Sequence, residues 1–158
     1  MISTLEQLEQ QAIDNNVYLL SAPLPDQIKG LLFASLEFTT ITLNSTLITS
    51  PQRATVLAEE LGHFHTTPID LFTAPEHLQR QYELRAAVWA ANEVAPLSSI
   101  VQAWQTGVRS HWELAEYLGV TEEFIVRALE LHSARCGLST RVGEYLITFD
   151  LLHIEEVS

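Results

Sequence analysis

Apolar positions recur at helical spacing through most of the chain and at strand spacing near its start. Residues 2–14 carry an apolar side chain every three or four positions, which predicts a first helix. Residues 17–20 are β-prone, and segments 31–36 and 38–43 are rich in strand formers. We expect the last two segments to form an antiparallel pair or part of a meander.

The remainder of the chain predicts helices, with proline and glycine residues between them. Ser50 and Pro51 suit a helix start, because serine can cap a helix and proline fits its first turn. Thr73 begins a similar signal, and Pro96 ends the helix that follows it. Helices are predicted over 50–65, 73–92, 98–105, 111–118 and 121–132, and a last strand over 145–149.

This order of elements predicts an α+β fold: a small antiparallel sheet packed on a mostly helical body with a C-terminal helical hairpin. The sequence contains no internal repeat, low-complexity tract or linker. We therefore expect a single domain over residues 1–158, a length sufficient to bury a core.

The composition of the chain indicates the cellular compartment in which it works. Hydrophobic residues make up 47% of the chain, yet no apolar run is long enough to span a bilayer. The start of the chain lacks the layout of a signal peptide, and Cys136 is the only cysteine, so we expect a cytoplasmic protein without membrane contact.

The net charge of −12 disfavours direct binding of nucleic acid and favours a basic partner. Residues 112–129 resemble a helix-turn-helix, which raises the alternative of a DNA-binding regulator. Glu122, Glu123 and Glu130 decorate the second helix, where phosphate binding requires positive charge. We interpret this hairpin as a packing or partner-docking element.

The helix predicted over 50–65 carries the candidate chemistry. Ala54, Leu57, Leu61 and Phe64 fall on one apolar stripe. Glu59 and His63 are four residues apart, so they share a face roughly opposite that stripe. One side of this helix should pack on the core while the other presents two possible metal ligands.

The segment Glu-Glu-x-x-His resembles the zincin motif His-Glu-x-x-His, with Glu59 in place of the first histidine. In that motif the i and i+4 residues bind zinc and the glutamate between them, here Glu60, is the general base. The same residues also suit a solvated acidic helix face with His63 near its negative end. Gly62, inside the helix, suggests close packing or access.

The zincin resemblance also implies a third ligand. In glutamate zincins it lies on a following helix, about twenty residues after the second histidine. Glu83 occupies that position, and two antiparallel helices would bring it to His63. Glu76 and Glu93 are competing carboxylates on the same predicted helix.

Three segments resemble the ImmA/IrrE metallopeptidases. Residues 57–67, LAEELGHFHTT, are similar to the active-site helix of that family. Residues 83–91, ELRAAVWAA, followed by Pro96, are similar to its second signature. Residues 113–124, ELAEYLGVTEEF, resemble members from phages and mobile elements. The resemblance covers nearly the whole chain.

The resemblance implies a single ImmA/IrrE-like, zincin-like domain acting as a Zn²⁺-dependent endopeptidase. Its substrate would be a helix-turn-helix transcriptional repressor of a phage, mobile element or stress regulon, inactivated by site-specific cleavage. Carried over by residue, Glu60 is the general base, His63 and Glu83 are zinc ligands, and Glu59 stands where many members have the first histidine. The alternative, motivated by Glu59, is an antirepressor that binds the repressor without cleaving it.

Each of three other histidines has more than one possible role. His65 is either a substitute ligand or a surface or capping residue, since it points to another side of the helix than His63. His111 and His132 are candidates for stabilising an oxyanion or for purely structural roles. The sequence does not select among these roles, nor does it specify the oligomeric state or the cleavage site.

Overall fold

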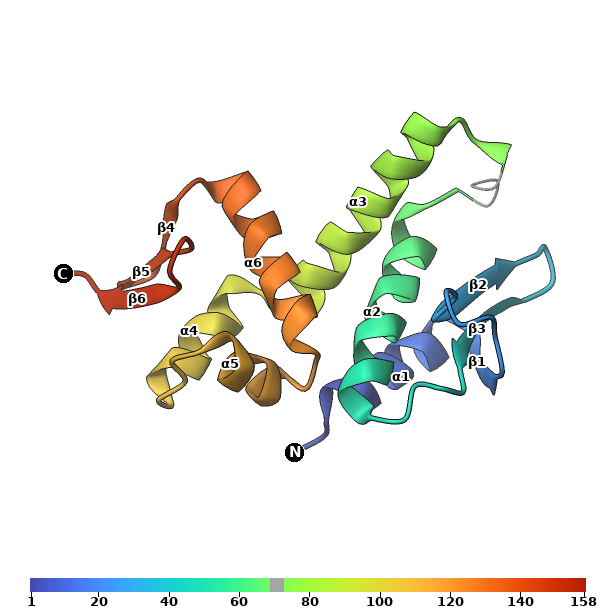
Figure 1. The fold of residues 1–158 in the computed structure, drawn as a ribbon, viewed down its shortest axis with the longest axis horizontal. Coiled ribbons are helices and arrows are strands. Elements are labelled where there is room, and N and C mark those ends of the chain that lie inside the picture. The colour runs from blue at the N-terminus through green and yellow to red at the C-terminus, as the bar shows by residue number, and fades with distance from the viewer. Residues whose placement is uncertain (69–72) are drawn as a thin grey trace. The chain divides into compact units, whose positions relative to one another are not determined.

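The computed structural model describes residues 1–68 and 73–158 (Figure 1). The chain divides into two compact units, residues 1–90 and 91–158, each described by itself below. The elements are α1 (Thr4–Asp14), β1 (Val17–Ala22), β2 (Gly30–Ala34), β3 (Thr39–Asn44), α2 (Ser50–Thr66), α3 (Glu76–Val94), α4 (Leu97–Gln105), α5 (His111–Leu118), α6 (Glu122–Cys136), β4 (Ser139–Val142), β5 (Tyr145–Thr148) and β6 (His153–Glu156). The predicted α+β class is confirmed, whereas the single-domain organisation stays a prediction.

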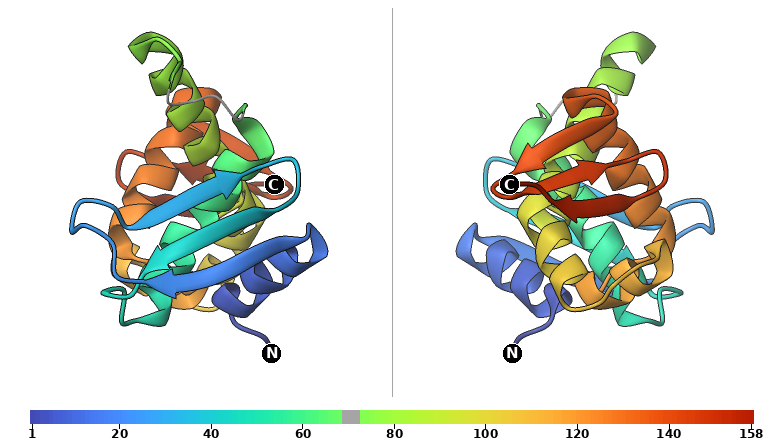
Figure 2. Two further views of the ribbon diagram at one scale, coloured as in Figure 1. Left: turned by 90° about the vertical axis from the view of Figure 1, so that its right-hand side faces the viewer. Right: turned by 90° about the vertical axis from the view of Figure 1, so that its left-hand side faces the viewer.

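A three-stranded sheet in the order β1-β3-β2 forms one layer of the first unit (Figure 2, left). Strands β2 and β3 are antiparallel, as predicted, but β1 pairs with β3 in parallel, so the sheet is mixed and not a meander. The connection from β1 to β2 is held by Asn44, which is 1% exposed. Its side-chain amide donates to the carbonyl oxygens of Leu24 and Ile28 at 3.1 and 2.9 Å.

Helix α2 packs against α1 and against β2 and β3 of this sheet. Ala54, Leu57 and Leu61 are each 0% exposed, which confirms the predicted apolar stripe over these three residues, whereas Phe64, its fourth member, is only half-buried. The predicted cap at Ser50 is wrong by one residue. Thr49 is the N-cap because its hydroxyl accepts from the backbone of Gln52 at 3.2 Å, and the Gln52 side chain accepts from the backbone of Thr49 at 3.2 Å.

Helices α2 and α3 approach each other closely at Gly62. A Cβ atom at Gly62 would lie 2.4 Å from the carbonyl oxygen of Ala86 on α3. Only a residue without a side chain allows the two backbones to approach to this distance. The close packing suggested by a mid-helix glycine is therefore confirmed, and it fixes which residues of α3 face α2.

The second unit contains the predicted C-terminal hairpin, formed by α5 and α6. Gly119 ends α5 in the left-handed conformation, with φ of 71°, and the hydroxyl of Thr121 caps α6. A three-stranded antiparallel sheet, β4-β5-β6, completes this unit (Figure 2, right). Only β5 was predicted, so β4 and β6 are additions. In the described residues, no helix has the length and apolar character needed to cross a bilayer.

Candidate metal centre

Helix α2 and strand β2 together position the carboxyl group of Glu60. A Cβ atom at Gly30, the first residue of β2, would lie 2.9 Å from Cγ of Glu60 and 2.7 Å from Cγ1 of Val56. Glu60 is half-buried because it lies against the backbone of β2 at a residue that has no side chain. Glycine in a strand often marks close approach of another group, and this signal in the sequence could have indicated the contact.

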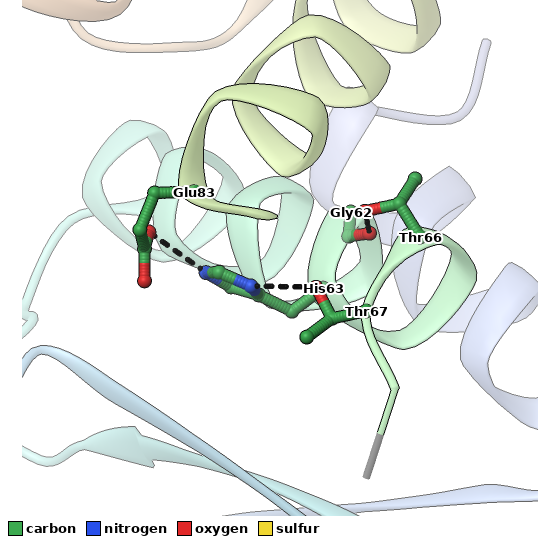
Figure 3. A network of polar contacts seen from close by, with 5 residues as sticks. All are labelled: Gly62, His63, Thr66, Thr67 and Glu83. Atoms are coloured by element: carbon green, nitrogen blue, oxygen red, sulfur yellow. Dashed lines mark hydrogen bonds and ion pairs between the residues drawn. The ribbon is translucent and has the colours of Figure 1, made fainter. Parts of the chain in front are cut away.

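His63 on α2 and Glu83 on α3 are brought into direct contact (Figure 3). Nε2 of His63 lies 3.1 Å from Oε2 of Glu83. The His63 side chain is 15% exposed and that of Glu83 is 63% exposed, so the pair lies at the surface with its imidazole enclosed. The contact follows from the Gly62–Ala86 approach, because Glu83 lies one helical turn before Ala86.

The other ring nitrogen of His63 contacts Thr67, the residue that ends α2. Nδ1 of His63 and Oγ1 of Thr67 are 3.2 Å apart. Both nitrogens of the imidazole therefore have a polar partner within the chain, which fixes the orientation of the ring. Figure 3 shows the ring held between Glu83 and Thr67.

The carboxylates of Glu59, Glu60 and Glu83 repel one another. Burial, with repulsion from Glu83, raises the pKa of Glu59 to about 7. Burial, with repulsion from Glu59 and then Glu83, raises the pKa of Glu60 to about 7. A bound cation at this position would relieve that repulsion and favour the ionised carboxylates.

The atoms assembled here match the preferences of zinc in type and partly in arrangement. Imidazole nitrogen and carboxylate oxygen are zinc ligands, and two ligands at about 2.0 Å from a tetrahedral ion are about 3.3 Å apart. The 3.1 Å separation of the His63 and Glu83 atoms is close to that value. Within residues 1–68 and 73–158, however, no group of three or more His, Cys, Asp or Glu side chains is arranged to hold a metal ion. Glu59 lies on α2, one turn before His63.

A protein-family model described as an IrrE N-terminal-like domain, a peptidase family, matches residues 12–130. The chain belongs to this family. No curated protein is similar enough to the chain to be matched. The match covers every residue of the candidate centre and confirms the resemblance stated from the sequence. The IrrE N-terminal-like family supports a metallopeptidase-like, hydrolytic function for this chain.

The competing carboxylates differ from Glu83 in their surroundings. Glu76, at the start of α3, pairs with Arg80 at 3.2 Å. Glu93 belongs to the second unit. Glu83 contacts His63 directly. The roles of Glu59, Glu60, His63 and Glu83 in binding and catalysis stay predictions.

Two of the three other candidate histidines, His65 and His132, make packing or hydrogen-bonding contacts away from the candidate centre. The ring of His65 stacks on Trp89 of α3, with centroids 4.7 Å apart and planes at 23°. His132 is 3% exposed, and its Nε2 lies 2.7 Å from the carbonyl oxygen of Ala95. Burial lowers the pKa of His132. His111 is the first residue of α5.

Proposed function

We propose that this member of the IrrE N-terminal-like family is a zinc-dependent endopeptidase that inactivates a helix-turn-helix repressor by site-specific cleavage. The observation that carries the proposal is the contact of His63 with Glu83 across α2 and α3, with Glu60 held beside β2. These residue types at these positions match the zincin pattern of two ligands and an intervening carboxylate.

Glu59, His63 and Glu83 would hold the ion. Glu59 lies one helical turn before His63, so a rotation of its side chain would bring its carboxylate to the His63–Glu83 pair. When bound, zinc would supply Lewis-acid activation of a water molecule and of the scissile carbonyl group. The donor set of one imidazole and two carboxylates carries more negative charge than one with two histidines.

Glu60 is suited to move the proton. Its carboxyl group is half-buried, and its packing against Gly30 restricts where the side chain can point. In the proposed reaction Glu60 accepts a proton from the attacking water and passes it to the leaving amine. A carboxylate within hydrogen-bonding reach of the attacking water and of the leaving group can both accept and release that proton.

The surface of the first unit favours a protein partner. Four large apolar side chains on β1 and β2 are exposed, namely Tyr18, Leu20, Leu31 and Phe33. Tyr18 and Phe33 both pair with Thr40, so they share one face of the sheet, and exposed apolar groups of this size commonly mark sites of protein contact. A repressor carries basic groups for DNA, which suit the net charge of −12.

The test uses the zinc-loaded chain and a helix-turn-helix repressor from the same genome as the candidate substrate. We expect one new pair of repressor fragments by mass spectrometry, lost with a chelator and restored by added zinc. Glu60→Gln should retain zinc and repressor binding but reduce cleavage at least about 100-fold. Cleavage that persists in Glu60→Gln would contradict the assigned role of Glu60. Stable binding of intact repressor by the zinc-loaded wild type would support the antirepressor alternative instead.

A further inference from the structure

Thr67 makes two separate contacts with His63. Thr67 is the C-cap of α2, with φ of −112° and ψ of 131°, and its backbone N–H donates to the carbonyl oxygen of His63 at 2.9 Å. Its hydroxyl lies 3.2 Å from Nδ1 of the ring. Thr66, still within the helix, instead donates its hydroxyl to the carbonyl oxygen of Gly62 at 2.7 Å. The change of backbone direction at Thr67 therefore places a hydroxyl group at the imidazole (Figure 3).

The partners of the ring determine where its proton lies. A carboxylate oxygen can only accept, so the contact with Glu83 places a proton on Nε2 of His63. In the neutral ring Nδ1 then carries a lone pair, and the hydroxyl of Thr67 donates to it. A metal ligand at Nε2 requires the opposite arrangement, because the lone pair must lie on Nε2 and the proton on Nδ1.

A hydroxyl group can serve both arrangements without displacement of its oxygen. It donates to Nδ1 when the proton is on Nε2, and it accepts from Nδ1–H when Nε2 binds a metal. A backbone carbonyl or a carboxylate in the place of Oγ1 would accept only, and would favour one tautomer. The imidazole of His63, at 15% exposure, leaves little room for water to replace the hydroxyl.

We infer that Thr67 is the positioning residue of His63, and that its hydroxyl reverses from donor to acceptor when Nε2 exchanges Glu83 for a metal ion. The inference about the exchange rests on the proposed function. Thr67 thus holds the ring in one orientation in both states, so that metal binding requires a proton to relocate within the ring but no movement of the helix end.

Four chains test the inference: wild type, Thr67→Val, Thr67→Ser and, as a matched control, Thr66→Val. In the metal-free protein at about pH 8, where a neutral imidazole is favoured, the ¹⁵N resonance of Nδ1 reports whether its lone pair accepts a hydrogen bond. We expect wild type, Thr67→Ser and Thr66→Val to show the hydrogen-bonded resonance and Thr67→Val to show the unbonded one. Thr67→Ala repeats the measurement should the valine variant not fold.

Zinc affinity, measured by competition with a chelator, is the second readout. Loss of a residue that orients a metal-binding histidine typically weakens affinity about 10- to 100-fold, and we expect this for Thr67→Val. Thr67→Ser should restore affinity to within about threefold of wild type, and Thr66→Val should leave it unchanged.

Two results would overturn the inference: an Nδ1 resonance unchanged in Thr67→Val, or a serine variant that binds zinc as weakly as the valine variant. A wild-type chain that takes up no zinc would refute the proposed function and the donor-to-acceptor exchange. The Nδ1 resonance of the metal-free chains would still decide whether Thr67 positions His63.

Discussion

Replacement of Gly62 by alanine tests the helix crossing that brings His63 to Glu83. The new Cβ atom would lie 2.4 Å from the oxygen, 3.0 Å from the carbon and 3.1 Å from the Cα atom of Ala86. All three are backbone atoms, so no side chain can move aside, and the helices must separate by about 1 Å. Overpacking of this kind costs about 1–3 kcal/mol. The better helix propensity of alanine offsets about 1 kcal/mol.

Because the three close contacts are with backbone atoms, the overpacking cost should lie in the upper part of that range, at about 2–3 kcal/mol. After the propensity offset, the net expectation for Gly62→Ala is a loss of about 1–2 kcal/mol in the free energy of unfolding, and a Tm lower by about 3–8 °C. Urea and thermal denaturation of the metal-free chain, followed by circular dichroism, measure both quantities. Gln81→Ala, at an exposed position of α3, is the control and should change stability by less than about 0.5 kcal/mol. A Gly62→Ala chain as stable as wild type, or more stable, would refute the close approach of α2 and α3.

Three further predictions concern Glu60 and His132. Gly30→Ala brings its Cβ against side-chain atoms of Val56 and Glu60 and not against backbone, so it should cost less stability than Gly62→Ala. Displacement of Glu60 should lower the rate of repressor cleavage at least about tenfold. Burial lowers the pKa of His132 below its ordinary 6.5, so the unfolded chain binds its proton more readily and the wild type loses stability as the pH falls below about 6.5. The glutamine in His132→Gln can still donate a hydrogen bond to the carbonyl oxygen of Ala95 but does not titrate. The fall in the free energy of unfolding between pH 7 and pH 5.5, measured by urea denaturation, should therefore be smaller in this variant than in the wild type. The pKa of Glu60 is raised to about 7 from 4.5, so its contribution to stability is lost as the pH rises through 7. In the metal-free chain at pH 8, Glu60→Gln should therefore be more stable than wild type by about 1–2 kcal/mol, and a variant of equal or lower stability would contradict the raised pKa.

The parts of the fold that follow from local pattern were predictable. The stripe of Ala54, Leu57 and Leu61 is buried because a 3.6-residue repeat must face the core wherever the helix packs. The bounds of α5 match the prediction because Ser110 and Gly119 mark its two ends by local hydrogen bonding and backbone conformation.

The parts that depend on distant segments were not predictable. The parallel pairing of β1 depends on Asn44, whose side chain binds carbonyl groups 16 and 20 residues earlier. Strands β4 and β6 have four residues each, too few for a clear alternation of apolar and polar positions. The cap at Thr49 in place of Ser50 depends on backbone angles that both residue types can adopt.

In the candidate centre, too, the features set by local pattern could be predicted and those set by distant segments could not. The i, i+4 spacing of Glu59 and His63 and the distance along the chain to Glu83 could be taken from the sequence, because helix geometry fixes the first and the family pattern the second. The contacts of Gly30 with Glu60 and of Thr67 with His63 could not. The first joins a strand to a helix, and the second depends on the residue at which α2 ends.

The central claim, that α2 and α3 together form a zinc site, is tested most directly by the zinc content of the purified chain. Elemental analysis after dialysis should give about one zinc ion per wild-type chain. Content should fall close to zero in His63→Ala and in Glu83→Ala. Glu76→Ala, which removes the carboxylate paired with Arg80, should remain at the wild-type value. A wild-type chain without zinc, or a zinc content in the His63→Ala and Glu83→Ala chains equal to that of the wild type, would contradict the account.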